Sequence, residues 1–552
     1  MTLGPLIVQS DHTVLLEVAH PDAEDARHEL AVFAELERAP EHIHTYRITR
    51  LGLWNARAAG HTAEEILDTL NRHAKFPVPS GVAGEITDTM RRYGRLTIER
   101  DADGALVLRC DDPAILREVS SAKKIAPLLG NRIDDRTFPV EPWARGELKQ
   151  QLVARGWPAE DLAGYTPGEP YDIELAESDG DADGEGAWHL RDYQAKAVEA
   201  FQRGGSGVVV LPCGAGKTIV GAASMAAVGA KALILVTNAV SARQWRDELI
   251  RRTTLTEEEI GEYSGQVKEI KPVTIATYQI LTSRRKGEYQ HLSLLDAQDW
   301  GVIVYDEVHL LPAPVFKLTA ELQARRRLGL TATLVREDGR EGDVFSLIGP
   351  KRYDAAWKDI EAQGFIAPAA CFEVRVTLPE SERMDYAVAE DQDRYRIASS
   401  TPEKQRIARR IIDKHPDEQV LVIGQYIDQL EAMAEALDCP LITGQTPVDE
   451  RERLFQAFRS GEERILVVSK VANFSVDLPD ASVAIQISGS FGSRQEEAQR
   501  LGRLLRPKSD GITASFYTLI ARDTVDQDFA QNRQRFLAEQ GYSYTILDAD
   551  EV

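Results

Sequence analysis

The stretch Leu211–Thr218 reads LPCGAGKT, and the fold prediction starts from it. An apolar run, Gly207–Leu211, precedes it, and a helix-competent run, Ile219–Ala227, follows. This order of strand, glycine-rich loop and helix is typical of a phosphate-binding loop, in which main-chain N–H groups turn onto phosphate oxygens. The full motif begins with a glycine where this chain has Leu211, so a tight structural turn that opens a helix remains the alternative for this stretch alone.

Each residue type in the loop suits one part of a bound nucleotide. Glycines let the main chain turn inward, a lysine ammonium reaches the β- and γ-phosphates, and a threonine hydroxyl can hold Mg²⁺. We therefore expect a nucleoside triphosphate with Mg²⁺ as cofactors. The predicted cofactor-binding residues of the loop are Cys213, Gly214, Ala215, Gly216, Lys217 and Thr218.

Length and composition limit the remaining possibilities. The chain has 552 residues, 43% of them hydrophobic, which is enough for three or four domains with ordinary cores. It has no apolar run of the ~18 residues that a membrane span needs and no basic region with a cleavage site typical of a signal peptide. The four cysteines are far apart and form no CxxC pair, which predicts neither structural zinc nor disulfides, and a cytoplasmic protein.

The net charge of −23 argues against a nucleic-acid partner, because such binding relies on neutralising phosphates. A local basic groove can overcome this average. Two basic clusters are candidates for such a groove, although either can instead be a solvated surface. They are Arg284, Arg285 and Lys286, and Arg325, Arg326 and Arg327.

The chain divides into segments of different texture. Residues 1–94 predict a mainly helical domain from the periodicity of Glu24–Arg38 and Ala63–His73, and residues 95–175 predict a small α+β domain. In the second segment, Tyr171–Leu175 is one of the expected strands. Residues 176–187 are acidic and glycine-rich and are expected to form an exposed linker.

From Trp188 onward, short apolar strands alternate with helices, which implies buried parallel sheets. Two clusters of strands, split near residue 360, predict two α/β domains in series over residues 188–360 and 361–552. The expected strands are Gly207–Leu211, Ala232–Val236, Thr274–Thr277, Val302–Tyr305, Leu328–Leu330, Val420–Ile423, Ile465–Val468 and Val483–Ile487.

A carboxylate pair follows the strand Val302–Tyr305. Ligands collect at the carboxyl ends of parallel strands, where Asp306 can hold Mg²⁺ and Glu307 can orient and deprotonate an attacking water. A helix N-cap is the alternative for such a pair. The position about 90 residues after the phosphate loop favours catalysis.

Three further motifs suit a nucleotide-driven motor. Before the loop, Gln194 can bond an adenine edge and Arg191 can brace the loop. After the strand Leu328–Leu330, the hydroxyl residues of Thr331–Thr333 can couple the nucleotide site to another surface. In the string QRLGRLLR, Arg503 and Arg506 share one helical face, and they can reach the γ-phosphate if the second α/β domain closes on the first. A surface basic helix is the alternative for that string.

Together these motifs resemble superfamily 2 helicases, and closely the bacterial form of the XPB-type (xeroderma pigmentosum group B) DNA repair helicases. The matching strings, in the family's order over about residues 188–510, are LRDYQ, LPCGAGKT, TNAVSARQW, TYQIL, YDEVH, LTAT, ITGQT, SKVANFSVDLP and QRLGRLLRP. Residues 336–338 match the RED triplet of this family. A thumb-like insertion is expected near residues 378–403, an extra N-terminal domain near 1–100, and a damage-recognition domain near 95–175.

The resemblance implies an α/β fold with two RecA-like motor domains in tandem, with ATP and Mg²⁺ between them and DNA along one edge. It implies nucleotide contacts for Arg191 and Gln194, Mg²⁺ ligation by Thr218 and Asp306, and catalysis by Lys217, Asp306, Glu307, Gln499, Arg503 and Arg506. It places along the DNA track or at the point of strand separation Thr237, Gln244, Trp245, Thr277, Arg336, Glu337, Asp338 and Thr443.

Two features depart from the family pattern. Ala472, Asn473 and Phe474 stand where the family usually has Gly-Asp-Thr, and the expected thumb is acidic. The function that we expect is nevertheless an ATP-dependent DNA helicase in nucleotide excision repair, with 3′→5′ polarity implied by the family. Its partners would be single-stranded or forked DNA and a repair nuclease. The alternatives are a double-stranded DNA translocase that remodels complexes, and an ATP-switched scaffold that recruits a nuclease or transcription factor.

Overall fold

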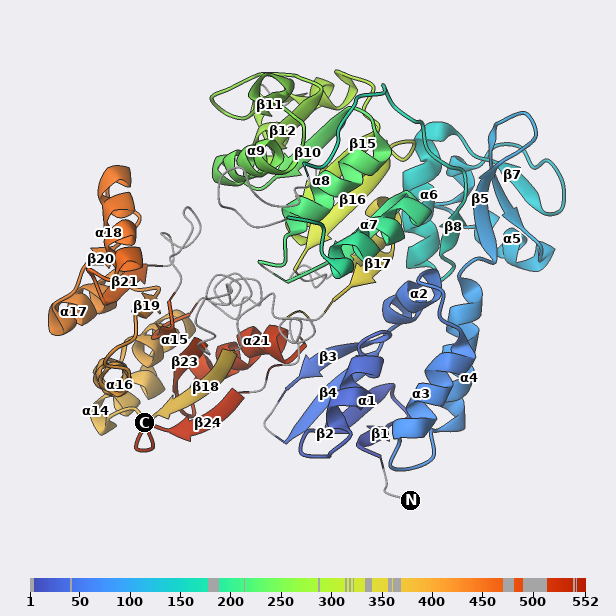
Figure 1. Cartoon of the computed structure of the whole chain (residues 1–552). Coiled ribbons are helices and arrows are strands. Elements are labelled where there is room, and N and C mark those ends of the chain that lie inside the picture. Colours follow the sequence, from blue (N-terminus) through green and yellow to red (C-terminus); the bar gives the residue numbers. More distant parts are fainter. Residues whose placement is uncertain are drawn as a thin grey trace.

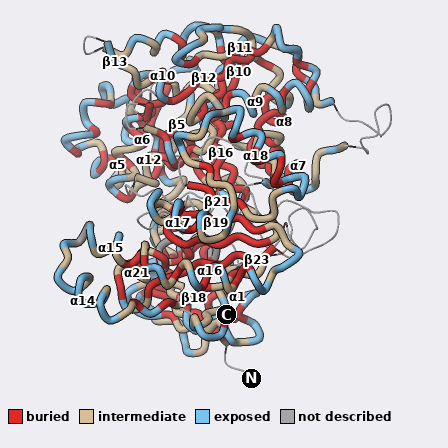
Figure 2. The backbone as a smooth tube through the Cα atoms, turned by 90° about the vertical axis from the view of Figure 1, so that its left-hand side faces the viewer, coloured by how far each residue is buried: buried red, intermediate tan, exposed pale blue. Residues whose placement is uncertain are grey.

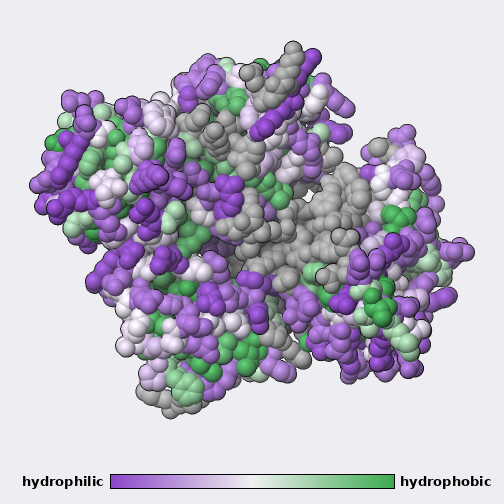
Figure 3. All heavy atoms as spheres, turned by 180° about the vertical axis from the view of Figure 1, so that it is seen from behind, coloured by the Kyte–Doolittle hydropathy of each residue, from purple (hydrophilic) through white to green (hydrophobic). Residues whose placement is uncertain are grey.

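The computed structural model describes most of the chain. The described residues are 4–39, 42–176, 188–212, 214–285, 288–312, 315–316, 319–320, 322–332, 340–355, 360, 369–469, 481–489, 514–539, 542 and 544–552. Within these ranges, no helix combines the length and the apolar character required to cross a membrane. One face of the molecule carries mostly polar side chains, with small apolar groups among them (Figure 3).

The first large sheet is built around the phosphate loop. Its seven strands pair in the order β11-β12-β10-β15-β16-β9-β17, and every pairing is parallel. The strands are β9 (Ser206–Val210), β10 (Ala232–Val236), β11 (Ile260–Tyr263), β12 (Val273–Thr277), β15 (Val302–Asp306), β16 (Arg326–Thr331) and β17 (Lys351–Asp354). Helices α7 (Asp192–Gly204), α8 (Lys217–Val228) and α9 (Ala239–Arg252) pack on it (Figure 1). Since β9, β10 and β12 are buried along their whole length, their apolar runs are explained.

The second large sheet has the same character. Its order is β20-β21-β19-β22-β23-β18-β24, again parallel throughout. Its strands are β18 (Ala369–Val376), β19 (Val420–Gly424), β20 (Leu441–Ile442), β21 (Ile465–Ser469), β22 (Val483–Gln486), β23 (Ala514–Ala521) and β24 (Tyr544–Asp548). Its helices include α16 (Pro402–Lys414), α17 (Ile427–Leu437), α18 (Val448–Ser460) and α21 (Val525–Glu539). Both sheets are buried at their centres (Figure 2), and two parallel-sheet α/β domains in tandem are confirmed.

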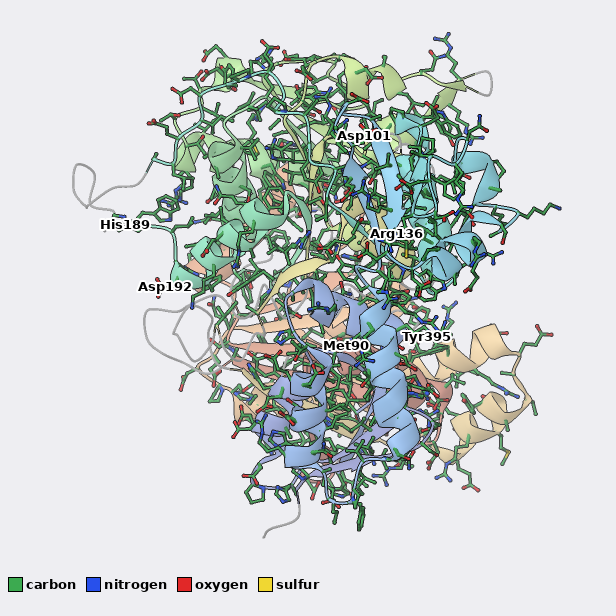
Figure 4. The ribbon with its side chains drawn as sticks, turned by 90° about the vertical axis from the view of Figure 1, so that its right-hand side faces the viewer. Met90, Asp101, Arg136, His189, Asp192 and Tyr395 are labelled. Carbon is green, nitrogen blue, oxygen red and sulfur yellow. The ribbon has the colours of Figure 1, made fainter. Side chains whose placement is uncertain are left out.

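The expected thumb-like insertion contains two helices, α14 (Glu380–Val388) and α15 (Asp391–Ser400), which pack against each other. Tyr395 of α15, labelled in Figure 4, is fully buried. Its ring lies edge-on to Phe529 of α21, at 5.0 Å between centroids. The insertion is therefore anchored to the second sheet domain through α21.

Residues 4–94 contain a sheet that the sequence did not predict. Four antiparallel strands, in the order β1-β2-β4-β3, accompany four helices. These elements are β1 (Leu6–Val8), β2 (Thr13–Glu17), α1 (Ala23–Leu30), β3 (Ala34–Arg38), β4 (Ile43–Ile48), α2 (Arg50–Ala58), α3 (Ala63–His73) and α4 (Ser80–Arg92). The helix predicted over residues 24–38 is wrong in its second half: α1 ends at Leu30, and in β3 the buried Ala34 and Leu36 alternate with more exposed residues, as a strand requires.

Residues 96–161 form an α+β unit, the class of fold predicted for the segment 95–175. Its sheet order is β7-β6-β5-β8, with strands β5 (Leu96–Arg100), β6 (Leu106–Cys110), β7 (Thr137–Pro139) and β8 (Ala159–Asp161) and helices α5 (Pro113–Ser120) and α6 (Arg145–Ala154). Figure 4 shows Asp101 and Arg136 in this unit, above Met90 of α4. The strand predicted at Tyr171–Leu175 is wrong, because this segment runs along the first sheet domain, where the Tyr171 N–H donates to the Gly229 carbonyl and Leu175 forms one isolated bridge with Thr253.

The N-terminal segment touches both large sheet domains (Figure 1). Towards the first, the Lys351 N–H donates to the Asn55 side chain over 2.9 Å, and Trp54 lies 6.3 Å from Phe345 between ring centroids. Towards the second, the Arg535 guanidinium of α21 donates to the Leu36 carbonyl, and Ala538 joins the N-terminal core. This segment therefore bridges the two domains.

Candidate active site

The phosphate loop lies between β9 and α8, as its sequence predicts. Gly214 and Gly216 have φ values of +82° and +80°, which few residues other than glycine adopt. A Cβ on Gly216 would also lie 2.5 Å from Nε2 of Gln194. No side chain caps α8, which begins at Lys217. The first turn of that helix is therefore suited to phosphate oxygens.

A tyrosine and a glutamine of α7 brace this loop. The Tyr193 hydroxyl donates to the Ala215 carbonyl over 2.7 Å, and Gln194 Nε2 donates to the same oxygen over 3.0 Å. Gln194 Oε1 accepts from the Arg191 N–H at 3.0 Å, and Gln194 is 2% exposed. In this conformation Gln194 therefore braces the loop, the role expected of Arg191, and its amide is not directed at an adenine. Tyr193 was not among the predicted site residues, and its only signal in the sequence was its place in LRDYQ.

The predicted carboxylates meet the loop. Strands β9 and β15 flank β16, so their carboxyl ends lie close together, and Lys217 Nζ lies 3.5 Å from Glu307 Oε1. Glu307 has a left-handed φ of +48°, a strained conformation for a non-glycine residue and one that is common at functional sites. Burial, followed by repulsion from Glu307, raises the pKa of Asp306 above its ordinary value. A bound cation would offset both effects.

Two aromatic side chains hold Asp306. Trp245 Nε1 donates to Asp306 Oδ2 over 3.0 Å, and the Tyr278 hydroxyl donates to the Asp306 carbonyl over 2.7 Å. Both residues are buried, with Trp245 2% exposed. The prediction that the Trp245 side chain lies along a DNA track is therefore wrong in this structure, because the indole faces the sheet. Tyr278 was not predicted to belong to the site.

A second chain of contacts leads from Glu307 to the end of β16. His309 Nδ1 lies 3.5 Å from Glu307 Oε2 and 2.6 Å from Thr331 Oγ1. The Leu211 N–H in turn donates to the Thr331 carbonyl over 2.9 Å. The hydroxyl residue expected to couple the nucleotide site to another surface thus contacts both the carboxylate motif and the base of the phosphate loop.

The predicted DNA-track residues differ in exposure. Gln244 is exposed, whereas Thr237 and Thr443 are half-buried. Thr277 is 4% exposed, and its hydroxyl caps the short helix α10 (Tyr278–Thr282) by accepting from the Ile280 N–H. The buried position of Thr277 leaves its side chain with a structural role in this conformation.

The two basic clusters differ in how far their side chains are buried. Arg327 is fully buried and donates to the carbonyls of Leu347 and Gln323 over 2.7 and 2.8 Å. Arg325 pairs with Asp299. Arg325 and Arg327 therefore hold the start of β16 in place, and the buried Arg327 cannot line a DNA groove. A groove role for the partly exposed Arg326 stays a prediction. Arg284 and Arg285, in contrast, are exposed on β13 (Arg284–Arg285).

The remaining predicted residues lie outside the described ranges, and their roles stay predictions. They are Cys213, Lys286, Thr333, Arg336, Glu337, Asp338, Ala472, Asn473, Phe474, Gln499, Arg503 and Arg506.

The donors at the site fit a nucleotide-bound Mg²⁺. Mg²⁺ keeps several waters and is usually bound by one or two protein oxygens together with phosphates, and Thr218 and Asp306 provide such oxygens. Across the described ranges, no group of three or more His, Cys, Asp or Glu side chains is arranged to hold a metal by itself.

Comparison with known proteins places the chain in a family. A Kineococcus radiotolerans protein named DNA 3′-5′ helicase XPB is 66% identical over 552 residues, which are 100% of this chain and 98% of that protein. This chain belongs to the XPB family of DNA helicases. The Mycobacterium tuberculosis protein of the same name is 64% identical over 100% of this chain and 99% of that protein. A Saccharomyces cerevisiae relative, 31% identical over 98% of this chain and 72% of its own length, is named a helicase/translocase subunit of general transcription and DNA repair factor IIH.

Family models match the chain in three places. Residues 360–551 match the ERCC3/RAD25/XPB C-terminal helicase, which includes the second sheet domain. Residues 187–336 match the type III restriction enzyme res subunit, which includes the phosphate loop and the carboxylate pair. Residues 6–134 match a helicase conserved C-terminal domain. The match of the XPB model therefore covers the sheet domain that follows residue 360.

Proposed function

We propose that the chain hydrolyses ATP with Mg²⁺ in the cleft between its two sheet domains and uses the energy to separate DNA strands, 3′→5′, in nucleotide excision repair. The observation that carries this proposal is the contact of Lys217 with Glu307, since it joins the phosphate loop to the carboxylate motif. The resemblance to the XPB relatives supplies the DNA substrate and the polarity.

The contact between Lys217 and Glu307 suggests how the site responds to its substrate. Lys217 is the cation suited to β- and γ-phosphates, and Glu307 is the general base. While they are paired, the Lys217 ammonium lies against one oxygen of the Glu307 carboxylate. When Lys217 turns to phosphate oxygens, Glu307 can take a proton from water, and His309 keeps it oriented. Thr218 and Asp306 would hold the Mg²⁺, which would supply charge stabilisation for the transferred phosphoryl group.

The assignments beyond this site are proposals from the family pattern. Arg191 contacts the nucleotide, and Gln499, Arg503 and Arg506 act on the γ-phosphate from the second motor domain. Thr237, Gln244 and Thr443 line the DNA track, and the triplet at residues 336–338 acts where strands separate. The motor domains span 188–360 and 361–552, preceded by domains at 1–94 and 95–175 and a linker at 176–187. The protein works in the cytoplasm, on single-stranded or forked DNA, with a repair nuclease as partner.

A Lys217→Ala variant tests the ATPase. It removes a phosphate-binding cation, so DNA-stimulated hydrolysis should be abolished while circular dichroism shows the fold intact. Normal turnover would contradict the assignment of the loop.

A second candidate function is movement along duplex DNA without strand separation, which the name of the yeast relative favours. Unwinding of a forked duplex, measured beside displacement of a triplex-forming strand from intact duplex, separates the two. Triplex displacement without unwinding would establish a translocase. ATP hydrolysis that DNA leaves unchanged would instead favour a switched scaffold.

A further inference from the structure

The indole of Trp245 is placed between the metal-binding carboxylate and a helix expected on the DNA track. Trp245 lies on α9, directly after the exposed Gln244. Its side chain points the other way, into the domain, and its N–H donates to Asp306 Oδ2 over 3.0 Å. One helix therefore carries an outward DNA candidate and an inward contact with the catalytic carboxylate.

A glycine in α8 makes room for this indole. A Cβ on Gly221 would lie 2.4 Å from Cη2 of Trp245 and 3.2 Å from Cδ1 of Leu330. Glycine inside a helix costs about 1 kcal/mol relative to alanine, and here it lets the ring pack directly on α8. The helix that begins at Lys217 is thus in contact with the same ring that bonds Asp306.

Both oxygens of the Asp306 carboxylate are oriented by protein donors. Oδ2 accepts from Trp245, and Oδ1 accepts from the Glu307 N–H at 3.1 Å. The Tyr278 hydroxyl fixes the main-chain carbonyl of the same residue. Of these contacts, the one to Trp245 comes from α9, so a movement of α9 would act on Asp306 through Oδ2.

We propose that Trp245 is a positioning residue that sets Asp306 for Mg²⁺ and transmits DNA contact at α9 to that carboxylate. The inference rests on the proposed function. DNA that binds beside Gln244 moves or fixes α9, and the indole N–H carries this change to Oδ2. Trp245 itself touches neither DNA nor nucleotide.

The test compares two buried tryptophans of the same domain. Trp245→Phe keeps a ring in the pocket and removes the N–H. Trp300→Phe is the matched control, because Trp300 is fully buried and its Nε1 donates over 3.1 Å to the Leu294 carbonyl, a main-chain group with no part in the site. Binding of a fluorescent, non-hydrolysable ATP analogue is measured with Mg²⁺ and with EDTA.

In the unaltered chain, Mg²⁺ should tighten binding of the analogue. Trp245→Phe should reduce this tightening by about tenfold, the effect of losing one hydrogen bond to a charged group, and leave binding in EDTA unchanged. It should also lower the factor by which DNA stimulates hydrolysis. Trp300→Phe should change neither quantity. Equal effects of the two variants, or no effect of Trp245→Phe, would overturn the proposal.

A second pair of variants covers the case in which Trp245→Phe does not fold. Gly221→Ala displaces the indole but keeps its N–H. Like Trp245→Phe, it should reduce the factor by which Mg²⁺ tightens binding of the analogue. Gly84→Ala, at a helical position with open space, is its control. If the unaltered chain shows no Mg²⁺-dependent binding, the proposed function fails. If the unaltered chain shows Mg²⁺-dependent binding and Gly221→Ala shows the same dependence, the positioning role of Trp245 fails and the proposed function stands.

Discussion

Replacement of Asp161 by alanine should destabilise the joint between the α+β unit and the first motor domain. The carboxylate accepts from Arg145 over 3.0 and 2.7 Å and from Lys149 over 2.7 Å, and the side chains of these two cations are only 1% and 8% exposed. Tyr165 lies between Arg145 and the buried Arg327 of β16, at 5.8 and 5.6 Å from the two guanidinium carbons. The cluster therefore connects α6 to the start of a central strand.

The magnitude follows from the two cations that would lose their partner. Removal of one member of a buried ion pair costs about 3–5 kcal/mol. Burial, opposed by Asp161, already lowers the pKa of Lys149 to about 8, so this lysine can release its proton instead of remaining charged. Neutralising a lysine of ordinary pKa 10.5 at pH 7 spans about 3.5 pH units, which corresponds to about 5 kcal/mol. This is the most that Lys149 can add to the free-energy cost of the substitution. We expect a loss of about 3–5 kcal/mol in the free energy of unfolding.

The assay is urea unfolding, followed by circular dichroism and by proteolysis at the joint. The control is Asp428→Asn, which breaks the exposed pair with Arg396 and should cause no measurable loss. Conversion of Arg145 and Lys149 to methionine and Asp161 to leucine should restore much of the stability, because an apolar set of similar volume avoids buried charge. A loss for Asp161→Ala as small as for Asp428→Asn, or a triple variant worse than the single one, would refute the reasoning.

Acid should weaken the same joint. Burial raises the pKa of Asp161, but the charges of Lys149 and Arg145 outweigh burial and hold this pKa well below its usual range. The folded state therefore favours the ionised carboxylate. Its contribution is complete above the ordinary pKa of 3.8 and is lost as the pH falls below that value towards the lowered one.

Three other substitutions test the site and the N-terminal domain. Glu307→Gln should lower hydrolysis about 10²–10⁴-fold and leave binding of an ATP analogue intact, since a general base is lost but no phosphate contact; equal losses in both would argue against the base. Tyr193→Phe should weaken analogue binding about fivefold through the lost bond to Ala215, and unaltered affinity would contradict the bracing role. Burial, followed by the charge of Arg27, lowers the pKa of His44 to about 4, so the unfolded chain binds more protons and stability should fall by about 2 kcal/mol between pH 7 and 5. His44→Phe should remove this pH dependence in thermal unfolding, and His61→Gln, at a half-buried residue, should not; the opposite result would exclude His44 as its source.

The strands that the sequence predicted are those buried on both faces. Ala232–Val236 agrees residue for residue with β10, and Val302–Tyr305 falls one residue short of β15. The strands that it missed include β11, β17 and β24, which lie at the edges of the two sheets and read IGEY, KRYD and YTILD. The interior strands β18 and β23 were missed as well, so position in the sheet explains only part of the difference. An edge strand has one neighbour and more contact with solvent, so its residues need not form an apolar run.

Motif position predicted which residues belong to the site more reliably than it predicted the direction of their side chains. Gln194 lies on a helix beside the phosphate loop, as its string indicates, whereas Trp245 and Thr277, on a helix and at a helix cap, were expected on the DNA track. Their side chains nevertheless face inward, because the neighbouring loop, sheet and helix end each offer a polar group that would otherwise be buried without a partner. Such a demand is a property of the assembled domain and leaves no trace in local composition.

The need to pair buried polar groups also explains why the two basic clusters differ in burial. Leu347 and Gln323, which lies just before β16, present carbonyls in the interior, and Arg327 supplies the donors that they need. An arginine used in this way contributes nothing to an outer groove. In a chain with a net charge of −23, each buried cation reduces the positive surface charge that can neutralise DNA phosphates. The exposed Arg284 and Arg285 are therefore the better candidates for a basic DNA-contacting edge of the first motor domain. Because the surface as a whole is not basic, nucleotide-driven positioning of the domains has to supply the rest of the DNA binding.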